Sequence, residues 1–60
     1  MKYFIVARHP SSGFPIPIVE EDYFRNHVIA LFDSFEEAET YAIGHTICDA
    51  GGYEIMEWVL

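Results

Sequence analysis

Basic residues are scarce in this chain. Among its 60 residues only Lys2, Arg8 and Arg25 are basic, against ten carboxylates, and the formal charge at neutral pH is −7. So acidic a surface repels phosphate backbones, and we therefore expect no direct binding to nucleic acid. The same charge attracts basic surfaces and speeds encounter with them, which predicts a protein partner with a basic surface.

Cysteine and long apolar runs are also lacking. Cys48 is the single cysteine, so no disulfide can form within the chain, and a lone thiol suits a reducing cytoplasm. No apolar run approaches the roughly 20 residues that cross a bilayer. The apolar residues 3–7 are followed at once by Arg8 and His9, too early for a secretory signal. We therefore expect a cytoplasmic protein that makes no membrane contact.

Apolar residues are abundant for so short a chain. Sixty residues allow one domain, 1–60, and a domain of this size buries only about 60% of the surface of its unfolded chain. Hydrophobic residues make up 52% of the sequence, which argues against disorder. Without a disulfide, the margin of stability is small, and a partner or a second copy is one way to raise it.

Three apolar segments are predicted to be strands, at residues 2–8, 28–32 and 53–60. The first two are apolar on both faces, which is typical of central strands. Pro15 and Pro17 lie between them in a proline-rich excursion, residues 10–26, and permit only an edge strand or an extended segment there. The pattern predicts an α+β fold of ββαβ type, a small three-stranded sheet in the order 2-1-3 with one helix on one face.

The helix is expected to run from Phe35 to about Ala50, where Gly51 and Gly52 stop it. Ser34 is placed to accept a hydrogen bond from the N–H of Glu37, and Glu37 to reach back to the N–H of Ser34. At 100° per residue, the stripe expected to face the sheet comprises Phe35, Ala38, Ala42, Thr46 and Ala50.

Apolar surface remains beyond that stripe. It comprises Ile43 and Ile47 on the helix, and the uncovered sheet face with residues such as Phe4, Val6, Met56 and Trp58. One interpretation is that the helix packs on a twisted sheet and the excursion covers a flank. The other is that either surface forms a homodimer or a partner interface.

Two residues of the helix carry reactive chemistry. His45 and Cys48 are three apart, which suits half of a metal site or a nucleophile beside a base. Zinc needs two more ligands, and no spacing supplies them, so a buried structural thiol beside an imidazole is preferred. We expect neither metal nor cofactor. So small a domain leaves no pocket deep enough to exclude water, so neither catalytic residues nor enzymatic activity is expected.

In size, acidity and strand–strand–helix–strand pattern, the chain resembles the small proteins that bacteriophages use to inhibit host or defence enzymes. The segment Phe32-Asp33-Ser34-Phe35-Glu36-Glu37-Ala38-Glu39 is similar to the capped helix starts of many such proteins. The resemblance implies an inhibitor, used in host takeover or against host defence, that binds a protein in the host cytoplasm and occludes it without catalysis.

Aromatic anchors inside a charged rim are what a compact interface needs, and the excursion provides both. The alternative for these aromatics is that they fold back on the sheet as core. A second functional hypothesis is an acidic DNA mimic whose carboxylates imitate a phosphate backbone in a nucleic-acid enzyme. The predicted partner-binding residues are Phe14, Glu20, Glu21, Asp22, Tyr23 and Phe24, with Ile43 and Ile47 on the helix.

Overall fold

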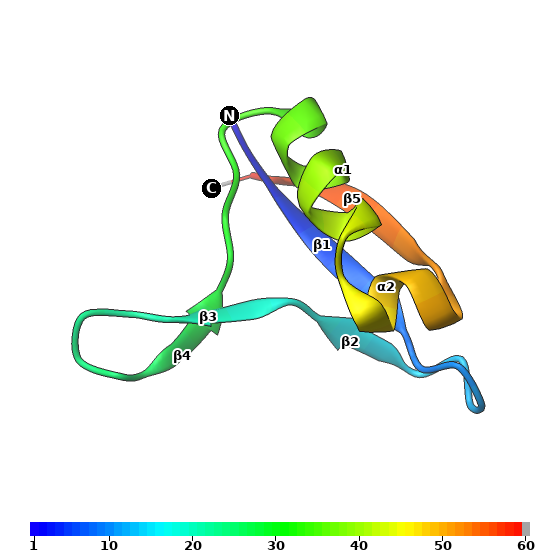
Figure 1. Cartoon of the computed structure of the whole chain (residues 1–60). Helices are drawn as coiled ribbons and strands as arrows, with labels where there is room; N and C mark the ends of the chain where they lie inside the picture. The colour runs from blue at the N-terminus through cyan, green and yellow to red at the C-terminus, as the bar shows by residue number, and fades with distance from the viewer. Residues whose placement is uncertain (60) are drawn as a thin grey trace.

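The computed structural model describes residues 1–59, so residue 60, the predicted end of the last strand, lies outside the described residues. Three strands form an antiparallel sheet in the order β2-β1-β5, and β3 pairs with β4 in a second, two-stranded sheet. Both helices lie over one face of the three-stranded sheet (Figure 1). The α+β fold with the first strand at its centre is thus confirmed. The elements are β1 (Lys2–Arg8), β2 (Pro15–Pro17), β3 (Val19–Glu21), β4 (His27–Ile29), α1 (Phe35–Ile43), α2 (Thr46–Gly51) and β5 (Tyr53–Trp58).

The central position of β1 follows from its apolar residues on both faces. Side chains alternate between the two faces of a strand, and Ile5 and Ala7 point toward the helices and are fully buried. Ile5 lies opposite Ile55 of β5, and Ala7 lies opposite Ile16 of β2. One strand therefore supplies packing surface to both of its neighbours.

Residues 28–32 are predicted to form the strand on the second side of β1, and the structure differs from this prediction. Only Phe32 of that segment pairs with β1, in an isolated bridge to Tyr3 in which the two backbones exchange hydrogen bonds of 2.9 and 2.8 Å. The rest of this edge is occupied by β2, whose Pro15 and Pro17 lie opposite Arg8 and Val6. Prolines are compatible with this position because an edge strand needs donors on one side only.

The predicted single helix over 35–50 is wrong in its length, because the helix breaks at Gly44 and His45 into α1 and α2. The predicted cap at Ser34 is confirmed, since the N–H of Glu37 donates to its Oγ at 3.1 Å. Glu37 reaches back, but its carboxylate accepts from the N–H of Asp33 at 3.4 Å rather than from Ser34.

The break changes which residues face the sheet after it. Ala38 and Ala42 of α1 are fully buried, as the stripe predicts. Thr46 and Ala50 belong to the same predicted stripe but are exposed, and Cys48 is buried in their place. Phe35 is also 45% exposed, because its ring packs edge-on against Tyr3 rather than into the core.

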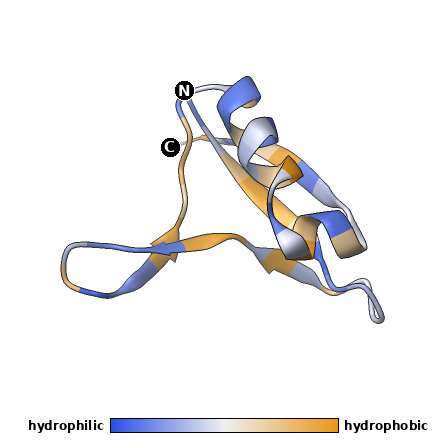
Figure 2. Cartoon of the chain, viewed as in Figure 1, coloured by the Kyte–Doolittle hydropathy of each residue, from blue (hydrophilic) through white to orange (hydrophobic). Residues whose placement is uncertain are grey.

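The core is built mainly from small side chains. Its partly buried neighbours are Tyr3, Phe32, Tyr53 and Ile55, and hydrophobic residues concentrate where β1, β2 and the helices meet (Figure 2). Small core residues hide little apolar area, so many larger apolar side chains of this domain stay in contact with water. The buried residues are Ile5, Ala7, Ile18, Ala30, Ala38, Ala42 and Cys48.

Candidate functional site

Residues 19–29 form a hairpin that we call the arm. Val19 lies opposite Ile29, and Glu21 lies opposite His27, so β3 and β4 run antiparallel up to a five-residue tip, 22–26. The arm extends away from the helices and from the three-stranded sheet (Figure 1). It is joined to the core at its base, where Ile18 and Ala30 are buried and the N–H of Ala30 donates to the carbonyl of Ile18 at 3.0 Å.

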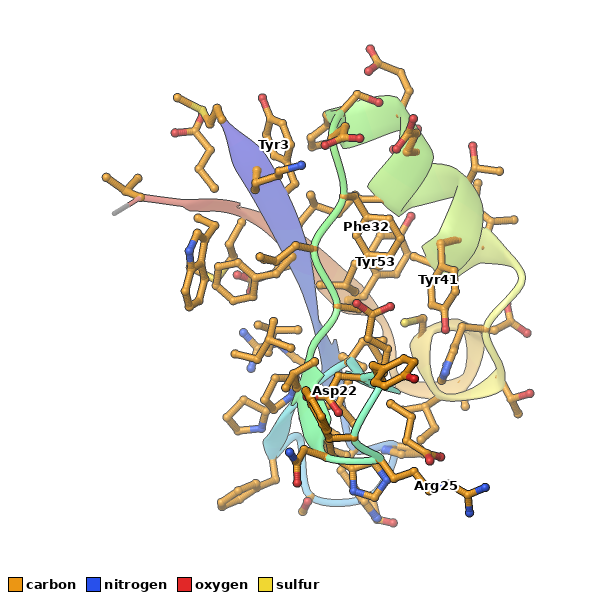
Figure 3. The ribbon with its side chains drawn as sticks, turned by 90° about the vertical axis from the view of Figure 1, so that its left-hand side faces the viewer. Tyr3, Asp22, Arg25, Phe32, Tyr41 and Tyr53 are labelled. Atoms are coloured by element: carbon orange, nitrogen blue, oxygen red, sulfur yellow. The ribbon has the colours of Figure 1, made fainter. Side chains whose placement is uncertain are left out.

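Asp22 organises the tip of the arm. Its Oδ1 accepts hydrogen bonds from the N–H groups of Phe24 and Asn26, both at 2.9 Å. Its backbone N–H donates to the carbonyl of Asn26 at 2.9 Å, and its carbonyl accepts from the N–H of Arg25 at 3.0 Å. A carboxylate that bonds its own following backbone is a standard way to stabilise a turn. Asp22 is half-buried in the turn (Figure 3). Its hydrogen bonds fix the shape of the tip.

The turn holds two aromatic side chains in water. Tyr23 is 94% exposed and Phe24 is 77% exposed. Their rings meet edge to face, with centroids 5.4 Å apart and planes at 85°, a favourable geometry for an aromatic pair. The alternative that these rings fold back on the sheet as core does not hold in this structure.

Carboxylates flank the aromatic pair. Glu20 and Glu21 of β3 are exposed, and they lie opposite Val28 and His27 of β4. Arg25 lies in the same tip with a φ of 64°, and it extends outward from the arm (Figure 3). The arm thus carries an apolar aromatic end beside a predominantly acidic stem.

Phe14, also predicted to bind a partner, lies elsewhere. It is 70% exposed at the end of the turn that follows β1, where its carbonyl accepts from the N–H of His9 at 2.9 Å. This turn lies at the opposite side of the molecule from the tip of the arm (Figure 1). Phe14 and the aromatic pair therefore do not form one surface.

Ile43 and Ile47 form a separate apolar position on the helices. Ile43, the last residue of α1, is 68% exposed, and Ile47 in the first turn of α2 is 38% exposed. Both flank the break at Gly44. The structure brings together Glu20, Glu21, Tyr23 and Phe24 in the arm, and leaves Ile43 on α1 and Ile47 on α2.

His45 and Cys48 do not share one continuous helix. His45 precedes α2 and its ring lies 5.7 Å from that of Tyr41, while Cys48 is buried and burial raises the pKa of its thiol. Within residues 1–59, Nδ1 of His45 is buried without a hydrogen-bond partner. The same residues include no cluster of three or more His, Cys, Asp or Glu side chains that could bind a metal ion.

The sheet face opposite the helices carries a further apolar surface. By the register of β1 and β5, Phe4, Val6, Met56 and Trp58 share this face. Leu31 joins them, because it lies between Ala30 and Phe32, which both face the core. The alternation of side chains along the strands predicts from the sequence that Phe4, Val6, Met56 and Trp58 share this face. The place of Leu31 on it could not be predicted, because it depends on the bridge between Phe32 and Tyr3.

Comparison with known proteins adds no relative: no family model, no curated protein and no solved structure matches this chain. The described residues form no pocket that could enclose a small molecule. Among them, no helix combines the length and the apolar character needed to cross a membrane. The candidate site therefore rests on the surface geometry of the arm.

Proposed function

We propose that this protein is a small protein-binding module of the cytoplasm that acts as a phage-type inhibitor, with the arm as its contact surface. The observation that carries the proposal is the aromatic pair, Tyr23 and Phe24, held outside the core by the hydrogen bonds of Asp22. Exposing two large aromatic rings lowers solubility and gives no folding energy in return. An interface gains from them, because aromatic side chains are the residues most enriched among binding hot spots.

The charge of the arm suggests the chemistry of the partner. Glu20 and Glu21 stand beside the aromatic pair and are solvated in the free protein. A partner surface with a hydrophobic pocket ringed by Lys or Arg complements this arrangement. Inhibition follows by occlusion, because the arm fills that pocket and no chemical step is needed.

Affinity capture with matched variants tests the proposal. Wild-type protein is immobilised beside a Tyr23→Ser, Phe24→Ser double variant and a Phe14→Ser control, which removes another largely exposed aromatic side chain at the opposite side of the molecule. We expect a partner that is held by wild type and control and bound about 30-fold or more weakly by the double variant. Equal capture of that partner by all three proteins would reject the arm as the contact surface.

The alternative proposal is a DNA mimic that occupies the basic channel of a nucleic-acid enzyme. Two of the ten carboxylates, Asp33 and Glu54, are neutralised by ion pairs with Lys2 and Arg8. The other eight lie outside the sheet face opposite the helices, and this unpaired acidic surface is what favours the alternative. Such binding weakens steeply between about 50 and 200 mM salt, and the Tyr23→Ser, Phe24→Ser change has little effect on it. Binding that is insensitive to salt but lost in the double variant would support the arm as the contact surface and reject the DNA mimic.

A further inference from the structure

The side of the three-stranded sheet that faces away from the helices, which we call the open face, is chemically distinct from the rest of the surface. Its apolar side chains come from all three strands and from Leu31, and Met56 on the edge strand β5 is 44% exposed. The rings of Phe4 and Trp58 meet edge to face on it, 5.7 Å between centroids. Its apolar residues are Phe4, Val6, Pro15, Pro17, Leu31, Met56 and Trp58.

The open face is also electrically neutral. Lys2 and Arg8 alternate with Phe4 and Val6 along β1, and each is paired with a carboxylate. Lys2 pairs with Asp33, and Arg8 contacts Glu54 at 2.6 Å. These two bases and two acids cancel, so the eight remaining carboxylates and Arg25 carry the whole formal charge of −7 elsewhere on the surface.

We propose that the open face binds a second copy of this chain, forming a two-fold symmetric dimer with the sheets face to face and the helices outside. Two molecules of charge −7 repel each other through their acidic surfaces, whereas on the open face the charges of Lys2 and Arg8 are balanced by Asp33 and Glu54, so two copies can meet there without net charge. A basic partner, by contrast, is drawn to the acidic surfaces. Face-to-face packing of twisted sheets is a common arrangement, with the sheets about 10 Å apart.

The dimer would bury apolar area that the core of the monomer lacks. Four of the seven buried residues are alanines, so the helix side of the sheet contributes little buried apolar area. Covering the open face adds a second hydrophobic layer, now on both sides of β1. Stability is then linked to association and rises with protein concentration.

The size of the open face sets the strength of association. β1 and β5 are about 20 Å long and β2 is about 10 Å long, so at a spacing of about 4.8 Å the three strands give a flat footprint of about 240 Å². A standard interface buries about 800 Å² per partner, which is several times this footprint. We therefore expect a weak dimer that is populated near about 300 µM and dissociates on dilution below that concentration.

Sedimentation velocity between about 1 and 300 µM tests the mass, which rises from 6.9 kDa toward twice that value. Raising the salt to about 0.5 M leaves the association intact or strengthens it, because salt screens the repulsion between the acidic surfaces. The chain has one tryptophan, Trp58, on the open face, so its emission shifts to longer wavelength as the dimer dissociates. A mass of one chain at every concentration overturns the proposal.

A matched pair of variants locates the interface. Met56→Glu places a carboxylate on the open face, and Ile43→Glu places one on the helices at a still more exposed position. We expect Met56→Glu to be monomeric, with at least a tenfold weaker association, and Ile43→Glu to dimerise as wild type does. The reverse result assigns the interface to the helices and overturns the proposal.

Two further readouts keep the test decisive. If Met56→Glu does not fold, the Trp58 emission of the wild-type chain on dilution still tests the proposal. A dimer that dissociates without any change in Trp58 emission does not use the open face, and this result overturns the proposal. A monomer whose emission changes only on addition of another protein assigns the face to that protein and also overturns the proposal. The Tyr23→Ser, Phe24→Ser variant dimerises normally, so failure of the arm and failure of the dimer are separate results.

Discussion

Gly51 lies so close to the backbone of Arg8 that it has no space for a side chain: a Cβ at position 51 would lie 1.8 Å from the carbonyl oxygen of Arg8. The chain is fixed next to this contact, because the N–H of Arg8 donates to the carbonyl of Gly52 at 3.0 Å. The end of α2 is therefore docked on the end of β1 through backbone atoms. Glycine is required at position 51, the last residue of α2, because two backbone segments of the chain approach closely there.

Gly51→Ala is expected to lower the free energy of unfolding by about 3 kcal/mol or more, because both clashing groups are backbone and neither can move aside cheaply. Gly44→Ala is the matched control: the nearest atom to its Cβ would be the carbonyl oxygen of Tyr41 at 3.9 Å. We expect the control to be neutral or stabilised by up to about 1 kcal/mol. Chemical denaturation of both variants checks this, and equal losses would contradict the contact.

Asp22→Ala is expected to loosen the tip of the arm, since Phe24 and Asn26 lose the acceptor of their N–H groups. Hydrogen exchange of those two amides should speed up while the amides of β1 stay protected. Asp22→Asn keeps an oxygen at the same position and should leave the exchange nearly unchanged. Fast exchange of these amides in the wild-type chain would show that the turn does not hold the aromatic pair.

The pH dependence of stability should include a contribution from Asp33. A hydrogen bond and the positive charge of Lys2 lower the pKa of Asp33 below its ordinary value of 3.8. Because the folded pKa is depressed, the contribution of this pair is fully present above pH 3.8 and is lost as the pH falls through the folded value. NMR titration checks it: Lys2→Met should return the pKa of Asp33 to about its ordinary value, and an unchanged pKa would exclude the pair in solution.

Cys48 is a natural probe of opening of the core, so no cysteine has to be introduced. Its side chain is buried, and burial raises the pKa of the thiol above its ordinary value, so little reactive thiolate is available in the folded protein. Alkylation near pH 8 should be slow in the native protein and at least about a hundredfold faster in denaturant, because it requires opening of the core. Comparable rates in the two states would mean that α2 is not stably packed on the sheet.

Local signals predicted the start and the end of the helical region. Ser34 caps α1 because its hydroxyl satisfies an N–H that the helix leaves unpaired, and Gly52 ends α2 with a φ of 84°. The apolar character of β1 on both faces likewise indicated its central place. These features depend on a few neighbouring residues, so the sequence carries them directly.

Features decided by distant contacts were not predictable in the same way. A glycine at position 44 costs a helix only about 1 kcal/mol, so periodicity alone does not show that the helix breaks there and brings Cys48 into the core. The arm escaped prediction because its strands are three residues long and its turn depends on the Asp22 side chain. Exposure of Tyr23 and Phe24 follows from that turn, and no apolar pattern encodes it.

The arm leaves the core at Ile18 and returns at Ala30, and a backbone hydrogen bond joins these two residues. Everything between them is a closed loop whose entry and exit points are fixed by the rest of the fold. Such a site tolerates replacement of its contents, so foreign peptides could be grafted between positions 19 and 29 and displayed on a scaffold of about fifty residues.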